Sequence, residues 1–223
     1  MLGRLVSPYP FAVGETLQYN AKLGYFPVGT ATISVTRLAR ERGLEAFVFT
    51  MAGQGGPPGW RVRYDLTSSV DSRRFNSLRF HRRLEQAGKV EEHEYVIVPD
   101  SARYRQAGKQ GDWVAPREPL DELAFLYFLR TVRLETGRSY SFDRYFMTGY
   151  NPIQVEVTGR ESVALPDGAV PCLALRVTTR GVATRVWLTD DARRLPAQLE
   201  VPLQFGAVTL VLAGKRGSGE AGK

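Results

Sequence analysis

The stretch at residues 182–213 reads VATRVWLTDDARRLPAQLEVPLQFGAVTLVLA, and its pattern decides the fold class. From Leu195 onward every second residue is apolar: Leu195, Ala197, Leu199, Val201, Leu203 and Phe205. A period of two over this length predicts a β-strand with one dry face and one wet face. Residues Thr189–Ala192 predict the turn before it. We expect an open, curved antiparallel sheet with an apolar concave face, which packs on another part of the chain or holds an apolar ligand.

Shorter alternating runs recur along the chain, at residues 30–37, 45–51, 61–70, 79–84, 92–98, 153–157 and 173–177. Turn signals separate several of them, including Arg42-Gly43, Ala87-Gly88 and Arg180-Gly181. Many short strands with hairpin-length gaps favour an antiparallel meander over βαβ units. Pro196 and Pro202 predict that the last long strand lies at a sheet edge or is bulged.

One segment breaks this rhythm and predicts a helix at residues 119–134. Pro119 suits the first helical position, and Asp121 and Glu122 suit the positive end of the helix dipole. Arg130 and Arg133 suit the other end. Because the middle is apolar nearly all round, we expect the helix to be buried across the mouth or concave face of the sheet.

The chain has 223 residues, enough for one sizeable all-β domain. We expect an N-terminal extension at 1–10, a single β domain at 11–213 and a disordered, Gly-rich tail at 214–223. No stretch approaches the ~20 apolar residues that a membrane-spanning helix needs. The first residues lack the apolar core of a secretory signal.

The net charge of +7 comes almost entirely from arginine, with 25 Arg and 5 Lys. These arginines are scattered among acidic residues, so we do not expect nucleic-acid binding. The densest basic stretch contains Arg73, Arg74, Arg79, Arg82 and Arg83. It is either a solvated face neutralised by nearby glutamates or a landing patch for anionic lipid or an acidic partner.

The sequence offers weak candidates for chemistry, and we expect no catalytic site, cofactor or metal. The adjacent pair Asp190-Asp191 is typical of a turn rather than of two carboxylates converging across a cleft. His81 and His93 are the only histidines. A hairpin centred on residues 87–88 places His81 near Glu94 and His93 near Arg82, which favours cross-strand ion pairing over a zinc site. The lone Cys172 is interpreted as a buried, inert thiol.

A set of ordered segments resembles a known family: FAVGETLQY at residues 11–19, Gly29-Thr30-Ala31, the apolar run at 123–130 and Val186–Asp191 with Leu195-Pro196. In this order and spacing they resemble the bacterial family called domain of unknown function 3108, over residues 11–213. The closing pattern is more remotely similar to periplasmic lipoprotein carriers of the LolA/LolB type. That resemblance implies an incomplete β-barrel lidded by helix, a periplasmic or envelope location and an acyl-chain ligand.

We therefore expect a non-catalytic envelope protein that holds a lipid or lipoprotein acyl chain on its concave face. The expected ligand-binding residues are Trp60, Tyr64, Phe125, Tyr127, Trp187, Leu199 and Val201. In this hypothesis the helix or the loop at residues 55–60 acts as a gate. The alternative is a structural module with a filled core that docks another envelope protein.

Overall fold

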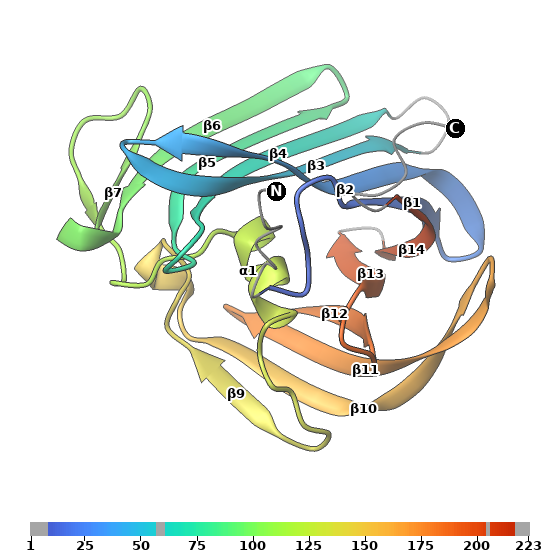
Figure 1. Ribbon diagram of the computed structural model, residues 1–223. Helices are drawn as coiled ribbons and strands as arrows, with labels where there is room; N and C mark the ends of the chain where they lie inside the picture. Colours follow the sequence, from blue (N-terminus) through green and yellow to red (C-terminus); the bar gives the residue numbers. More distant parts are fainter. Residues whose placement is uncertain (1–8, 57–60, 204–205, 217–223) are drawn as a thin grey trace, which may run out of the picture.

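The computed structural model describes residues 9–56, 61–203 and 206–216, and it forms one open antiparallel sheet of fourteen strands (Figure 1). The first half contains β1 (Thr16–Leu23), β2 (Phe26–Glu41), β3 (Leu44–Gly55), β4 (Val62–Asp71), β5 (Ser77–Gln86), β6 (Lys89–Val98), β7 (Arg103–Gln106) and β8 (Trp113–Val114). The second half contains β9 (Ser139–Phe142), β10 (Ile153–Leu165), β11 (Gly168–Thr179), β12 (Val182–Thr189), β13 (Pro196–Leu203) and β14 (Gly206–Arg216). One helix, α1 (Glu122–Leu129), and two 3₁₀ turns, Pro99–Ser101 and Thr148–Tyr150, complete the elements. The predicted all-β, incomplete-barrel class is confirmed.

The sheet is an antiparallel meander in which the first and last strands of the chain pair with each other. Its two free edges are strands from the middle of the chain. Its order is β8-β7-β6-β5-β4-β3-β2-β1-β14-β13-β12-β11-β10-β9, so β1 pairs with β14 while β8 and β9 are the two edges. The segment between these edges carries α1, which lies inside the curve of the sheet (Figure 1). Among the described residues, the segment that links the two sheet edges thus returns across the inner face of the sheet, where α1 packs on β3 and β4.

The predicted hairpin turns form where glycine permits a positive φ. Gly43, Gly88 and Gly181 have φ values of 84°, 76° and 77°, and the residue before each of them also has a positive φ. Two consecutive positive-φ residues are typical of the type I′ turn, whose twist matches that of the flanking strands.

The main hydrophobic core lies between the inner face of the sheet and α1. The ring of Tyr127, on α1, stacks on Phe49 of β3 with centroids 4.0 Å apart, and Phe11 contacts both. A second, smaller cluster lies on the outer face and contains Val163, Cys172, Ala174, Trp187 and Ala197. The C-terminal half of the sheet therefore buries apolar side chains on both faces.

The predicted alternation along β13 is wrong at one point. Leu195 and Leu199 lie in the inner core, but Ala197, between them, lies in the outer cluster. Trp187 pairs with Gln198 but Leu188 pairs with Pro196, so the register of β12 and β13 shifts by one residue at this point. Pro196 has no backbone N–H to donate to a regular ladder of hydrogen bonds. Because β13 lies between β12 and β14, the edge-strand prediction is wrong and the bulge alternative is right. Phe205 lies outside the described residues.

The helix is shorter than the predicted 119–134, and a side-chain hydrogen bond marks each of its ends. Asp121 is its N-cap: its carboxylate accepts hydrogen bonds from the backbone N–H groups of Leu123 and Ala124. Leu120 instead forms an isolated bridge with Tyr145. At the other end, the hydroxyl of Thr131 donates to the carbonyl of Phe128 and ends the helix.

The two predicted chain-end boundaries also differ from the structure. Tyr9, assigned to an N-terminal extension, stacks on Phe11 with ring centroids 5.2 Å apart. Strand β14 continues to Arg216, three residues into the predicted tail, and pairs there with Thr16. Residues 1–8 and 217–223 lie outside the described residues. Within the described residues no helix has the length and apolarity to cross a membrane.

A buried ion pair ties the C-terminal end of α1 to the start of the domain. The Arg130 side chain is fully buried, and its two terminal nitrogens donate to the Glu15 carboxylate over 2.6 and 3.0 Å. The same guanidinium donates to the carbonyls of Pro10 and Arg193. It therefore joins the N-terminal segment, α1 and the β12–β13 turn.

Replacing Arg130 by Met is expected to lower the free energy of unfolding by about 3–5 kcal/mol, because the Glu15 carboxylate is left unpaired in a buried site. Urea denaturation measures the change. The control is Arg133→Ala, whose side chain is 92% exposed and whose loss should cost under about 0.5 kcal/mol. Equal losses in both variants would contradict a structural role for the Arg130 ion pair.

Candidate functional site

The residues expected to bind a ligand are only partly brought together. Phe125, Tyr127 and Leu199 are buried in the inner core, and Tyr64 packs against it with part of its surface exposed. Trp187 is on the opposite face, where its indole N–H donates to Glu161 over 2.7 Å and Arg185 covers its ring. Val201 is 39% exposed. Trp60 lies outside the described residues, as does most of its loop.

Trp187 therefore does not line the concave face as the sequence analysis expected. It pairs with Ala174 across β11 and β12, and both residues belong to the outer cluster. Its neighbours Val186 and Leu188 take the inner positions instead. Because successive side chains of a strand point to opposite faces, Trp187 must face outward when Val186 and Leu188 face inward.

Along the strands, the side chains of the inner face change from fully buried near α1 to partly exposed further from it. Near α1, the row Phe49, Phe80 and Tyr95 is buried under the helix and the segment after β9. Two rungs further from α1, the row Ala31, Gly53, Tyr64 and Leu84 has small residues in β2 and β3. Tyr64 and Leu84 there are only partly buried. We name the end of the sheet beyond this row, with the hairpin ends Leu23–Phe26, Gly55–Val62 and Gln86–Lys89, the β1–β2 rim.

A cluster of polar groups lies on this inner face between the helix and the rim. Arg82 on β5 faces Glu122, in the first turn of α1, with 3.9 Å between the nearest nitrogen and oxygen. The Tyr145 hydroxyl donates to the other Glu122 oxygen over 2.8 Å. Tyr64 lies close enough to Arg82 for the Arg82 charge to oppose the rise in the pKa of the Tyr64 hydroxyl. We call Tyr64, Arg82, Glu122 and Tyr145 the inner polar cluster; the Arg82 side chain is 38% exposed and that of Glu122 30%.

Burial and neighbouring charge shift the proton affinities of this cluster. Desolvation and the adjacent Asp121 carboxylate raise the pKa of Glu122, against the Tyr145 hydrogen bond and the charge of Arg82. Burial raises the pKa of both Tyr64 and Tyr145. Burial alone would lower the pKa of Arg82, but Glu122 and the surrounding tyrosines outweigh it and raise the pKa. The cluster is thus a charge-balanced set of hydrogen-bonding groups on an aromatic surface.

Asp121, the residue before Glu122, holds the start of α1 in place beside this cluster. Its carboxylate is fully buried and accepts hydrogen bonds from the hydroxyls of Ser68 and Ser77 as well as from two helix N–H groups. Burial raises its pKa, although these four hydrogen bonds oppose the shift. Asp121 therefore fixes the first turn of α1 to β4 and β5, and with it the position of Glu122.

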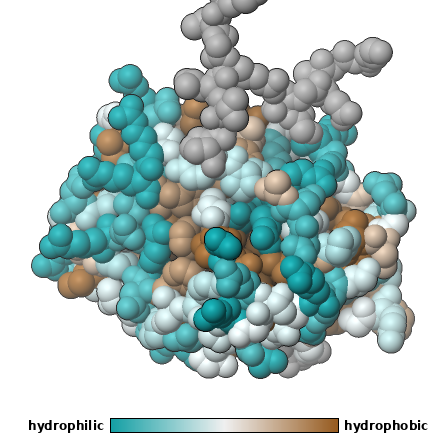
Figure 2. All heavy atoms as spheres, turned by 60° about the horizontal axis from the view of Figure 1, so that its bottom comes forward, coloured by the Kyte–Doolittle hydropathy of each residue, from teal (hydrophilic) through white to brown (hydrophobic). Residues whose placement is uncertain are grey.

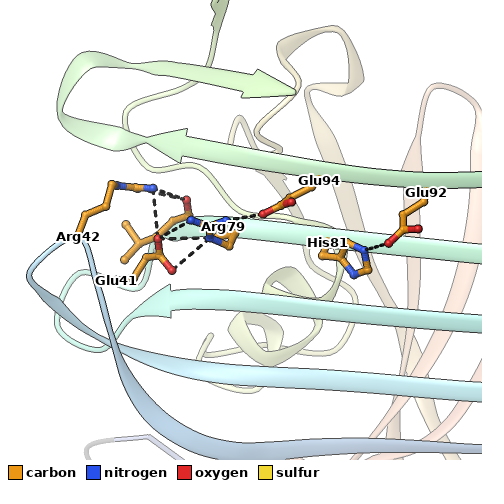
Figure 3. A network of polar contacts seen from close by, with 7 residues as sticks. Glu41, Arg42, Arg79, His81, Glu92 and Glu94 are labelled. Carbon is orange, nitrogen blue, oxygen red and sulfur yellow. Dashed lines mark hydrogen bonds and ion pairs between the residues drawn. The ribbon is translucent and has the colours of Figure 1, made fainter. Parts of the chain in front are cut away.

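The outer face of the same strands carries cross-strand ion pairs, as expected, but their partners differ from the predicted ones: His81 pairs with Glu92, and Glu94 pairs with Arg79. The register pairs His81 with Glu94 and Arg82 with His93, as expected for a hairpin centred on residues 87–88. Figure 3 shows the outer network, in which Arg79 bridges Glu41 and Glu94 and the His81 Nε2 lies 2.7 Å from Glu92. The two histidines take opposite faces, and no group of three possible metal ligands occurs among the described residues.

The sequence analysis missed Arg82, Glu122 and Tyr145 as members of a site. Arg82 was grouped with the basic run and Glu122 with the helix start. One signal was present: Arg82 falls between Phe80 and Leu84 in the period-two pattern, on the apolar side. Tyr145 carries no comparable signal, because it lies in the irregular segment after β9.

The remaining candidates have structural roles. Asp191 accepts hydrogen bonds from the backbone N–H groups of Arg193 and Arg194, as the turn interpretation predicts, and Asp190 pairs with Arg160 at 2.7 Å. Cys172 is fully buried in the outer cluster, and burial raises the pKa of its thiol to about 11. Such a thiol is a poor nucleophile at neutral pH.

Two surface clefts lie away from the inner polar cluster. One, of about 430 Å³, lies among the turn residues around Gly43, Asp71 and Asp100, and the other, of about 450 Å³, lies around Phe142 and Arg144 after β9. Figure 2 shows apolar side chains in the middle of the face that includes β9, surrounded by hydrophilic ones. Phe128 and Phe142 meet near this face with ring centroids 5.3 Å apart, and Arg144 covers Phe128.

A family model described as protein of unknown function (DUF3108) matches residues 18–213, almost all of the described sheet. The chain belongs to this family. A solved structure with the same fold is the β-barrel-like protein of domain of unknown function DUF1849 from Brucella abortus. It shares 9% sequence identity and a TM-score of 0.62, over 93% of this chain and 98% of that one. No curated protein matches the chain. These likenesses show the family and the β-barrel-like fold, and they assign no residue a function.

Replacing Glu122 by Gln is expected to flatten part of the pH dependence of stability. A carboxyl whose pKa is raised by folding contributes stability that is fully present below its ordinary pKa of 4.5 and is lost as pH rises through the raised value. The variant should therefore gain stability relative to the wild-type chain as pH rises above 4.5, which denaturation between about pH 4 and pH 8 measures. Glu118→Gln, at a side chain 72% exposed, is the control and should show no such trend. A constant difference across this range would rule out the raised pKa.

Proposed function

We propose that this DUF3108 protein is a non-catalytic binding protein that holds the acyl chain of a lipid or lipoprotein against its inner sheet face. The proposal rests on the way in which side-chain burial decreases along the inner face. The face is dry and filled beneath α1, but toward the β1–β2 rim its inward side chains are small or partly exposed. An apolar surface that the chain leaves partly uncovered is suited to an apolar ligand.

Small residues make room on this part of the sheet. Ala31 and Gly53 pair across β2 and β3, between the larger Tyr19 and Tyr64. A Cβ added at Gly53 would come no closer than 3.7 Å to another atom, so the backbone does not require glycine there for packing. Each Å² of apolar ligand surface covered here would contribute about 25 cal/mol.

The inner polar cluster supplies the second part of the proposal. Ligand sites are mostly apolar with a few placed polar groups that fix orientation. Arg82 and the hydroxyl of Tyr64 are hydrogen-bond donors next to the apolar row, while the Tyr145 hydroxyl donates to Glu122. In the proposed mode the acyl chain lies over Gly53 and against the partly exposed Tyr64 and Leu84, and its polar end meets Arg82.

Helix α1 forms the closed end of the proposed site rather than its gate. Asp121 fixes one end of α1 to β4 and β5, and Arg130 fixes the other end to Glu15. The ligand then enters from the β1–β2 rim. The family resemblance of the sequence supports a periplasmic or envelope setting for this function, in which acyl chains must be shielded from water.

The second candidate is an interaction module with a filled core. The close stacking of Tyr127 on Phe49 and the burial of five α1 residues favour it, since that part of the inner face holds only protein. In this case the apolar side chains in the middle of the β9 face would contact a partner protein (Figure 2).

Binding of a dansyl-labelled fatty acid, followed by fluorescence, distinguishes the two candidates. Gly53→Leu is expected to weaken binding at least about tenfold, because the new side chain fills the proposed site. The matched control is Gly159→Leu: Gly159 pairs with Ala174 of the outer cluster, and a Cβ there meets open space. Absence of binding to the wild-type chain, or equal weakening by both substitutions, would contradict the acyl-chain proposal and leave the interaction module.

A further inference from the structure

The Arg82–Glu122 pair on the inner face does not close into a direct hydrogen bond. Arg82 Nη1 and Glu122 Oε1 are 3.9 Å apart, beyond the roughly 2.7–3.2 Å of an N–H···O hydrogen bond. The other carboxylate oxygen of Glu122, Oε2, accepts from the Tyr145 hydroxyl over 2.8 Å. Because the side chains of Arg82 and Glu122 are both partly exposed, the two facing atoms can be reached by a ligand on the inner face.

The charges around this pair leave no surplus of positive charge. The Asp121 carboxylate accepts four hydrogen bonds from N–H and O–H donors, as an ionised carboxylate does. His93 pairs with Arg82 across β5 and β6, and its Nδ1 lies 3.0 Å from the amide nitrogen of Gln106. An amide nitrogen only donates, so this ring nitrogen accepts and the imidazole is neutral. Among the described residues whose charges act on Glu122, Arg82 is thus a single cation opposite the Asp121 carboxylate.

This balance of charge is unfavourable for an ionised head group. A carboxylate or phosphate beside Arg82 would be repelled by Asp121 and by the ionised form of Glu122, in a partly buried place that salt screens weakly. An ammonium group would be repelled by Arg82. Hydrogen bonding gives the same result, because an ionised carboxylate only accepts and an ammonium only donates. Neither group can satisfy both members of the pair.

A hydroxyl group can satisfy both members, because it donates one hydrogen bond and accepts others. An oxygen about 2.8 Å from both Arg82 Nη1 and Glu122 Oε1 accepts from the first and donates to the second, and their separation of 3.9 Å leaves room for it. The partly exposed ring of Tyr64, close to Arg82, adds an apolar surface with a polar tip. Such surroundings suit the carbon skeleton and the hydroxyls of a polyol.

We propose that the ligand of this site is a lipid with an uncharged, hydroxyl-bearing head group, such as a monoacylglycerol or a glycolipid, and that one of its hydroxyls bridges Arg82 and Glu122. The inference rests on the proposed acyl-chain function and names the head group that this function leaves open. The acyl chain extends from the bridge along Tyr64 and Gly53 toward the β1–β2 rim.

The test compares three dansyl-labelled ligands that share one acyl chain: the free acid, its methyl ester and its glycerol monoester. Fluorescence measures their binding to the full chain at about pH 7.5, where the acid is ionised. The glycerol monoester is expected to bind at least about tenfold more tightly than the acid and the methyl ester. A glucose monoester of the same acid, measured alongside, distinguishes a glycerol from a sugar head group.

Two variants test whether the pair sets this preference. Glu122→Gln keeps the shape and a hydrogen-bonding end but removes a negative charge. It should therefore bind the acid about tenfold more tightly than the wild-type chain does and change the affinity for the glycerol monoester little. The matched control, Glu118→Gln at an exposed side chain, should keep the wild-type ratio of the two affinities. Arg82→Met should weaken binding of the glycerol monoester at least about tenfold. Thermal unfolding checks that each variant is folded, and Glu122→Gln gives an independent result if Arg82→Met is not.

The outcomes separate this inference from the function on which it rests. If the wild-type chain binds none of these ligands, the acyl-chain proposal is wrong and the head-group inference is wrong with it. If the acid or the methyl ester binds as tightly as the glycerol monoester, the head-group inference is wrong and the acyl-chain proposal stands. The same conclusion follows if Glu122→Gln leaves the ratio of the two affinities unchanged.

Discussion

The attachment of α1 inside the open sheet is the constraint on which the rest of the structure depends. A sheet with two free edges and an apolar inner face cannot stay exposed to water, and eight helical residues are too few to be stable alone. Asp121, bonded to Ser68 and Ser77, and Arg130, paired with Glu15, hold the helix at both ends. These buried polar contacts give α1 a single position against the apolar surface, which non-directional burial alone would not specify.

This attachment divides the inner face into two parts with different properties. Beneath α1 the aromatic rings pack at the distances of a protein core, with Tyr127 on Phe49 at 4.0 Å. Beyond the first turn of the helix, the face has small residues at Ala31 and Gly53 and polar groups at Arg82 and Glu122. The filled part accounts for stability, and the uncovered part is the reason to look for a ligand there.

The charged side chains of the β5–β6 hairpin have different surroundings on its two faces, because successive residues point to opposite sides of the sheet. Arg79, His81 and their glutamate partners form a solvated network on the outer face (Figure 3). Arg82, one residue further along, points to the inner face and meets Glu122 from a distant part of the chain. The DUF1849 protein has a similar fold at 9% identity, so this fold requires few of the residue identities in this chain.

The sequence by itself determined the sheet, its hairpins and the pairing of His81 with Glu94, because period-two patterning and turn residues act locally along the chain. It also placed a buried helix near residues 119–134. Only the tertiary structure decided which strands meet at β1 and β14, where α1 begins and ends, and that Trp187 faces outward. Arg82, Glu122 and Tyr145 come together for the same reason: their contact depends on long-range docking of α1 against β5, which no local pattern records.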